Sequence, residues 1–262
     1  MKKRFGLILL GIIGLTLSGC GVSGGIYPDG DKYLAGNQTY NENLTSLDVD
    51  WISGNLTLIE DENIEGVKIE EDTDLTKESQ WVHSYLNDGV LKIKFFASGY
   101  RLNTPLTFKK DLTITYKPTL KNIKIELTSG KCTASKLSAE KCIIDITSGT
   151  ALVDTIEADN IVIDQTSGRI EINHISAQEL VSDMTSGTLK VGFSEIEKAT
   201  FDMTSGSLNM TLPEDGGKVK VSKTSGSITT NRECTVKSGL YTFGNGDADI
   251  KVSMTSGSVV IN

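Results

Sequence analysis

Regularly spaced carboxylates are the first feature of this sequence that could carry chemistry. Each lies four residues before a glycine, and that glycine closes a recurring Thr-Ser-Gly tripeptide. If every copy of the tripeptide belongs to one layer of a stack, the carboxylates form a line of negative charge on one face. Such oxygen ligands suit hard divalent cations, and the line could also attract a cationic cell-wall polymer. Its members are Glu126, Asp145, Asp164, Asp183 and Asp202, with Asp50 in the matching upstream position.

The same line has a simpler interpretation as a solvated acidic face. Like charges at the spacing of neighbouring strands repel one another, and a charged face also discourages association between sheet edges. We expect salt and nearby cationic side chains to relieve the repulsion. The cations that we assign to this role are Lys141, Arg169, Lys190 and Lys198. We prefer this interpretation, and we therefore assign no metal, no cofactor and no catalytic residue.

Thiols and imidazoles offer little further chemistry. The chain has only two histidines, too few for a multi-histidine metal site. Cys132 and Cys142 take positions where later repeats carry apolar residues, which predicts buried thiols. The sequence does not decide whether these two thiols form a disulfide bridge. Together with Cys234 they make an odd number beyond Cys20, so the sequence does not predict a complete disulfide framework.

The tripeptide marks an internal repeat of about 19 residues. Apolar and polar residues alternate around these glycines, as they do over residues 123–127 before Gly130. Alternation of period two over four to six residues predicts β-strands. The first four steps between successive glycines are equal, the fifth is slightly longer and the last is much longer. The glycines are Gly130, Gly149, Gly168, Gly187, Gly206, Gly226 and Gly257.

A unit this small cannot bury its own apolar face, so neighbouring units must stack. The sequence predicts an all-β fold, a right-handed parallel β-helix (a solenoid) with coils of about 19 residues, each holding two or three short strands joined by turns. We expect one domain over residues 44–262, irregular over 44–118 and regular over 119–262. Residues 47–58 follow the same template and predict the first coil or an N-terminal cap, and residues 250–261 predict the last coil.

The beginning of the chain predicts an export signal. Basic residues at positions 2–4 precede an apolar run that is too short for a comfortable transmembrane helix. The run ends in Leu-Ser-Gly-Cys, which resembles the lipobox of bacterial lipoproteins. That resemblance implies a signal peptide over residues 1–19 and lipidation of Cys20, where two acyl chains make a stable anchor. Residues 20–43 then predict a flexible spacer, because they are rich in Gly, Asn, Asp and Tyr without an apolar period.

The overall charge excludes one class of partner. The chain has 26 Lys and Arg against 34 Asp and Glu, a formal charge of −8 at pH 7. Proteins that bind nucleic acids rely on basic side chains to neutralise phosphates, so we expect no nucleic-acid partner. We expect the protein on the extracytoplasmic face of a bacterial cell membrane. Its expected partners are the membrane, through the lipid on Cys20, and a cell-wall polymer or envelope protein.

The repeats also resemble a known family. The stretch Asp-Trp-Ile-Ser-Gly-Asn-Leu-Thr-Leu from Asp50, the Thr-Ser-Gly ladder, and the closing residues 243–246 and 254–257 are similar to the bacterial "putative adhesin" family of β-strand-repeat domains of unknown function. The resemblance covers nearly all of the mature chain. It implies a β-helical envelope protein, often lipid-anchored, with no established enzymatic activity.

We therefore expect a non-enzymatic, lipid-anchored envelope protein that presents a repetitive surface for adhesion or envelope interaction. One alternative is a polysaccharide-active enzyme, because pectate-lyase-like solenoids use calcium carboxylates beside a basic residue, and Asp164, Asp183 and Arg169 offer those groups. Against it, coils of constant length leave no long loops that could form a cleft. The other alternative is an accessory protein of an envelope-stress response system.

Overall fold

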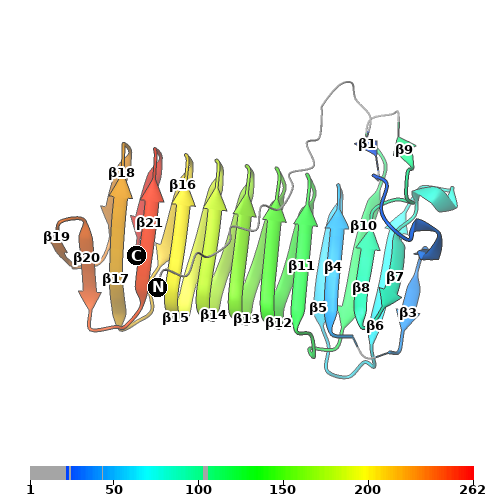
Figure 1. Cartoon of the computed structure of the whole chain (residues 1–262), viewed down its shortest axis with the longest axis horizontal. Helices are drawn as coiled ribbons and strands as arrows, with labels where there is room; N and C mark the ends of the chain where they lie inside the picture. The colour runs from blue at the N-terminus through cyan, green and yellow to red at the C-terminus, as the bar shows by residue number, and fades with distance from the viewer. Residues whose placement is uncertain (1–21, 24, 43, 103–105) are drawn as a thin grey trace, which may run out of the picture.

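The computed structural model describes residues 22–23, 25–42, 44–102 and 106–262. Figure 1 shows strands stacked side by side in one long row, so the expected all-β solenoid is confirmed. Within the described ranges the only helical elements are two short 3₁₀ turns, η1 (Gly30–Lys32) and η2 (Glu78–Gln80). No helix in this part of the chain is long and apolar enough to cross a membrane.

Four long strands form the regular centre of the stack. They are parallel and lie in register with one another, one repeat of the sequence apart. Each coil is one continuous strand of 16 residues, bent where the pairing with the next coil lapses, for example at Ser135 and Glu140. The expected separate strands joined by turns are therefore wrong in this detail. The strands are β12 (Lys131–Ile146), β13 (Thr150–Gln165), β14 (Arg169–Met184) and β15 (Thr188–Met203).

The Thr-Ser-Gly tripeptide forms the corner between consecutive coils, and backbone contacts hold these corners on top of one another. The Ser167 amide and hydroxyl both donate to the Thr147 carbonyl of the preceding coil, at 2.8 and 3.0 Å. Inside the coils, the alternating apolar side chains are buried in columns, as Ile144 and Ile163 illustrate. Removing this apolar surface from water is the main stabilising contribution to the stack.

The chain order and the spatial order differ at the C-terminal end. Strand β21 (Asp249–Met254) lies between β15 and β17 (Gly216–Lys223). In the same way, β22 (Ser258–Ile261) lies between β16 (Ser207–Thr211) and β18 (Ser227–Thr230). The final residues therefore insert into the stack instead of closing it, and the prediction that residues 250–261 form its last coil is wrong.

A similar displacement occurs at the N-terminal end. Strands β4 (Ser46–Trp51) and β5 (Asn55–Glu60) stack directly on β11 (Asn122–Leu127) and β12, which come much later in the chain. This pairing confirms residues 47–58 as a coil of the common template. The intervening residues extend the stack with β6 (Val67–Thr73), β7 (His83–Asn87), β8 (Val90–Lys94) and β10 (Lys110–Tyr116).

The described part of the predicted spacer is instead attached to the domain. Strand β1 (Val22–Ser23) pairs with β9 (Arg101–Leu102), while β2 (Leu34–Ala35) pairs with β7 and β3 (Gln38–Tyr40) with β6. The Tyr27 hydroxyl donates to the Phe96 carbonyl at 2.9 Å. The flexible-spacer prediction for residues 20–43 is therefore wrong for these residues. Residues 1–19 and Cys20 lie outside the described residues.

Candidate functional site

The predicted line of carboxylates is present, one residue in each coil. Asp145, Asp164, Asp183 and Asp202 lie directly opposite one another in successive strands. The line begins with Asp50, which is paired in register with Glu126, and it ends where Ser253 of β21 lies opposite Asp202. We call these six carboxylates, Asp50, Glu126, Asp145, Asp164, Asp183 and Asp202, the acidic stripe.

A shallow, open groove follows the acidic stripe. Its lining includes the stripe carboxylates from Asp145 to Asp202 and the threonines of the neighbouring corners, among them Thr166, Thr185 and Thr204. Neighbouring parallel strands lie about 4.8 Å apart, so the groove presents one carboxylate and one hydroxyl at each such step. A repeating row of this kind suits several weak contacts with an extended ligand.

Only the N-terminal end of the acidic stripe has cationic partners. Lys94 lies 3.3 Å from Asp50, and Lys124 lies 2.9 Å from Glu126. Among the described residues, no ion pair reaches the stripe from Asp145 onward. Partial burial raises the pKa of Asp164, and the neighbouring Asp145 and Asp183 carboxylates raise it further. The stripe thus carries an unrelieved electrostatic repulsion.

The cations that the sequence assigned to this repulsion lie elsewhere. Arg169 and Lys190 each bind Glu171 at 2.5 Å, beyond the glycine corner on the adjacent face. Lys198 binds Glu179 at 2.6 Å. Lys141 makes no ion pair within the described part of the chain. The assignment of Lys141, Arg169, Lys190 and Lys198 to the stripe is therefore wrong, because the last three bind carboxylates outside the stripe and Lys141 binds none among the described residues.

Metal-dependent catalysis finds little support in this arrangement. No group of three or more His, Cys, Asp or Glu side chains with metal-binding geometry occurs among the described residues. The stripe carboxylates form a line and not a cluster. Arg169, which a pectate-lyase-like site would need beside Asp164 and Asp183, is bound to Glu171 instead.

The three cysteines among the described residues lie in the core or against it. Cys132 and Cys142 are free and buried, so they form no bridge with each other, and the prediction of buried thiols is confirmed. Burial raises the pKa of each thiol to about 12, which keeps both protonated at neutral pH. Cys234 is also free, and it packs half-buried against the core.

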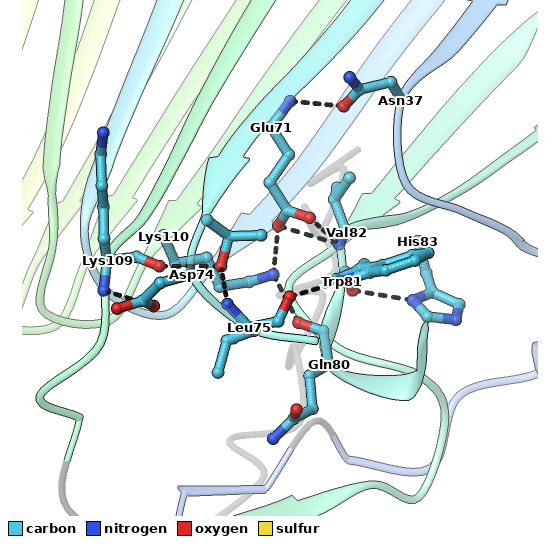
Figure 2. Close-up of polar contacts among 11 residues, drawn as sticks. Asn37, Glu71, Asp74, Leu75, Gln80, Trp81, Val82, His83, Lys109 and Lys110 are labelled. Atoms are coloured by element: carbon cyan, nitrogen blue, oxygen red, sulfur yellow. Dashed lines mark hydrogen bonds and ion pairs between the residues drawn. The ribbon is translucent and has the colours of Figure 1, made fainter. Parts of the chain in front are cut away.

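A buried ion pair near the N-terminal end was missed at the sequence level. The Lys110 ammonium binds the Glu71 carboxylate and donates to the Gln80 carbonyl at 2.7 Å, as Figure 2 shows. The two side chains are only 1% and 2% exposed. Glu71 also accepts the Val82 amide through both oxygens, at 2.9 and 3.0 Å. The alternation in β10 was the available signal, because Lys110 occupies the same inward register as Leu112.

Aromatic rings complete the surroundings of this lysine. The Lys110 ammonium lies 4.8, 5.3 and 5.4 Å from the ring centroids of Phe95, Phe96 and Trp51. Burial lowers the pKa of Lys110 to about 8, while Glu71 acts in the opposite direction. The pair joins β6, β10 and the loop before β7, so it connects the N-terminal strands to one another and has no access to a ligand.

Neutralising one member of the acidic stripe should stabilise the protein. We expect Asp164→Asn to raise the Tm by about 1–3 °C at pH 7, the effect of roughly 0.2–1 kcal/mol of relieved cross-strand repulsion in a domain of this size. Because the pKa of Asp164 is raised in the folded state, the gain should be complete above that pKa and disappear as the pH falls through it. Thermal melts of the parent and of Asp164→Asn between pH 3 and 8 measure this difference in Tm.

A calcium titration separates this interpretation from metal binding. A ligand that binds only the folded state raises its melting temperature. At constant ionic strength, we expect millimolar calcium to change the Tm of the parent protein and the Tm of the Asp164→Asn/Asp183→Asn variant by the same amount. A larger rise in the parent would contradict the interpretation of the stripe as a solvated face.

The sequence profile of the Toastrack DUF4097 family matches residues 38–262. This match confirms the resemblance to a family of β-repeat domains of unknown function, and the lipobox lies outside the matched residues. No curated protein matches the chain.

Several solved structures are similar to this chain at low identity. A "putative adhesin" from Parabacteroides distasonis shares 15% identity over 91% of this chain and 100% of that one, with a TM-score of 0.49. A "putative lipid binding protein" from the same organism shares 14% over 87% and 97%, with the same TM-score. A "putative cell adhesion protein" from Clostridium sporogenes shares 12% over 88% and 99%, with a TM-score of 0.38. A shared shape at such identity implies no shared ligand.

Proposed function

Since this chain belongs to the Toastrack DUF4097 family, we propose that it is a non-enzymatic binding scaffold held at the extracytoplasmic face of a bacterial membrane by lipid on Cys20. The observation that carries the scaffold role is the regularity of the groove, in which four successive coils present the same carboxylate in register. Catalytic sites normally break such regularity with loops that form a cleft. The proposed partners are a cell-wall polymer or an envelope protein.

The position of β1 bears on how the anchor would work. Val22 pairs with Leu102 of the domain, so only two residue steps separate Cys20 from a strand of the folded structure. Two steps of extended chain span about 7 Å. A lipid on Cys20 would therefore hold the N-terminal end of the stack close to the bilayer, where a flexible spacer would have let the domain move away.

Replacing Cys20 with alanine tests the anchor. We expect the parent protein to sediment with the membrane fraction and Cys20→Ala to appear in the medium or periplasm, or as unprocessed precursor. Cys234→Ala is a matched control, because it removes a free thiol within the domain and should leave the location unchanged. Fractionation followed by immunoblotting measures both. Processing and sedimentation of Cys20→Ala like the parent would contradict lipid anchoring.

A screen for glycan depolymerisation tests the scaffold role. We expect the purified protein to release no reducing ends from acidic or neutral polysaccharides, with or without calcium. Release that Asp164→Asn abolishes would instead establish the stripe as a catalytic site, because the substitution removes a single carboxylate and keeps the side-chain shape.

A further inference from the structure

Four exposed lysines gather at the C-terminal end of the face that carries the acidic stripe. Lys220 on β17 lies directly opposite Lys251 on β21. On its other side it lies opposite Leu240 of β20 (Leu240–Gly244), which in turn lies opposite Lys237 of β19 (Thr235–Lys237). Residues that are directly opposite in neighbouring strands project from the same face. We call Lys218, Lys220, Lys237 and Lys251 the lysine patch.

The lysine patch has no acidic partners within the described part of the chain. None of its members forms an ion pair, and the ion pairs that do occur involve no residue later than Lys198. Asp249 lies opposite Lys218 without binding it. Residues 216–262 carry six Lys and Arg against three Asp and Glu, although the whole chain has a charge of −8.

The strand register places Lys220 opposite Lys251, two like charges on neighbouring strands. Like charges directly opposite each other in a sheet destabilise it. The Lys220 ammonium donates to the Ser238 carbonyl, which carries no charge to offset this repulsion. Elsewhere the same fold pairs lysines with carboxylates of the neighbouring coil, as with Lys198 and Glu179. Unlike those lysines, the members of the patch bind no carboxylate among the described residues, so their ammonium groups can meet an external anion.

We propose that the lysine patch binds a linear phosphate polymer. Ammonium groups are compact point charges that bind phosphate well. Lys220 and Lys251 stand one strand spacing apart, about 4.8 Å, and Lys218 and Lys220 lie two residues apart on one strand, about 6.7 Å. These steps let an extended chain of phosphates contact several lysines at once.

The rest of the face would confine such a polymer to this end. The acidic stripe reaches Asp202 on β15, the strand next to the one that carries Lys251, and would repel phosphates that extended further along this face. The patch also lies at the opposite end of the stack from β1 (Figure 1). If the anchor proposed above holds, headgroups of the same membrane are out of reach. The choice of a polymer over a membrane surface rests on that proposed anchor.

Binding of linear inorganic polyphosphate tests the proposal. The assay uses the full chain in neutral detergent, which keeps both the lipidated and the unlipidated protein in solution. The binding measurement therefore does not depend on whether Cys20 is lipidated. We expect Lys220→Gln/Lys251→Gln to weaken binding at least tenfold by fluorescence anisotropy. The slope of log affinity against log salt should fall by about 1.4, since each lysine releases about 0.7 counterions from a single-stranded polyanion. The same variant should melt at a higher temperature than the parent, because it no longer carries two like charges in register on neighbouring strands.

Matched controls decide the outcome. Lys190→Gln/Lys198→Gln removes two lysines that already bind Glu171 and Glu179, and it should keep the parent affinity within twofold. The proposal would be overturned if both double variants lost polyphosphate affinity equally, or if the Lys220→Gln/Lys251→Gln variant lost none. Binding to anionic phospholipid vesicles without binding to polyphosphate would also overturn it, because the ligand would then be a membrane surface.

Discussion

Replacing Lys110 with methionine should destabilise the protein by about 3–5 kcal/mol, because Glu71 would then be a buried carboxylate without a counter-charge. The Val82 amide still donates to Glu71, but the ammonium and its contacts with three aromatic rings are lost. Urea unfolding of the chain from Val22 onward measures the loss. Trp51 provides the fluorescence signal, because its ring faces the Lys110 ammonium.

Two further variants make this prediction specific. Lys109→Met changes the preceding residue, whose ion pair with Asp72 is exposed, so the urea midpoint should stay unchanged. The double variant Lys110→Met/Glu71→Gln removes both charges and should recover most of the lost stability. The glutamine side-chain oxygen can still accept the hydrogen bond from the Val82 backbone N–H. If the double variant is no more stable than Lys110→Met, the loss arises from packing and not from an unpaired charge.

Replacing Gly168 with alanine should destabilise the protein by about 3–4 kcal/mol. A Cβ atom there would lie 2.2 Å from the Gly149 carbonyl oxygen, in the corner of the preceding coil. Neither corner can retreat easily, because the Arg169 amide donates to that same carbonyl at 3.0 Å. The φ of +90° adds strain for any residue with a side chain. Overpacking and backbone strain each contribute roughly 1–3 kcal/mol.

Two other glycines separate these contributions, and urea unfolding compares all three variants. Gly99 also has a positive φ, of 73°, but a Cβ there would meet nothing closer than 3.9 Å. Gly99→Ala should therefore carry only the backbone strain, about 1 kcal/mol. At Gly130 the φ is ordinary while a Cβ would lie 2.4 Å from the Gly54 carbonyl oxygen. A loss at Gly168 no larger than that at Gly99 would show that the stacked corners have room for a side chain.

The requirement for glycine at each corner explains why the repeat can be recognised in the sequence. Each corner lies against the backbone of the next, so a side chain is excluded at the same position of each coil. The alternation of buried and exposed residues follows directly from the geometry of a strand. Both constraints act within one coil and its neighbour. They allowed the solenoid, the buried cysteines and the acidic stripe to be predicted from residue types and spacing.

The buried pair of Lys110 and Glu71 could not be predicted in the same way. The alternation in β10 places Lys110 inward, but a lysine at such a position normally argues against burial. Its partner lies 39 residues earlier on a strand that runs antiparallel to β10. Only the folded arrangement of β6, β10 and the loop before β7 brings the two charges together and encloses them in aromatic rings.

The sequence by itself therefore determined the kind of coil, its period and the composition of each face, because these depend on local backbone geometry and on neighbours of the same template. The order of the coils in space was decided only by the tertiary structure. The long step from Gly226 to Gly257 is compatible with a longer final coil or with a strand that returns into the stack. Coils built on one template offer equivalent backbone hydrogen bonds at their edges, so local sequence does not decide which strands pair. The whole fold places β21 beside β15, and this brings the lysine patch next to the end of the acidic stripe.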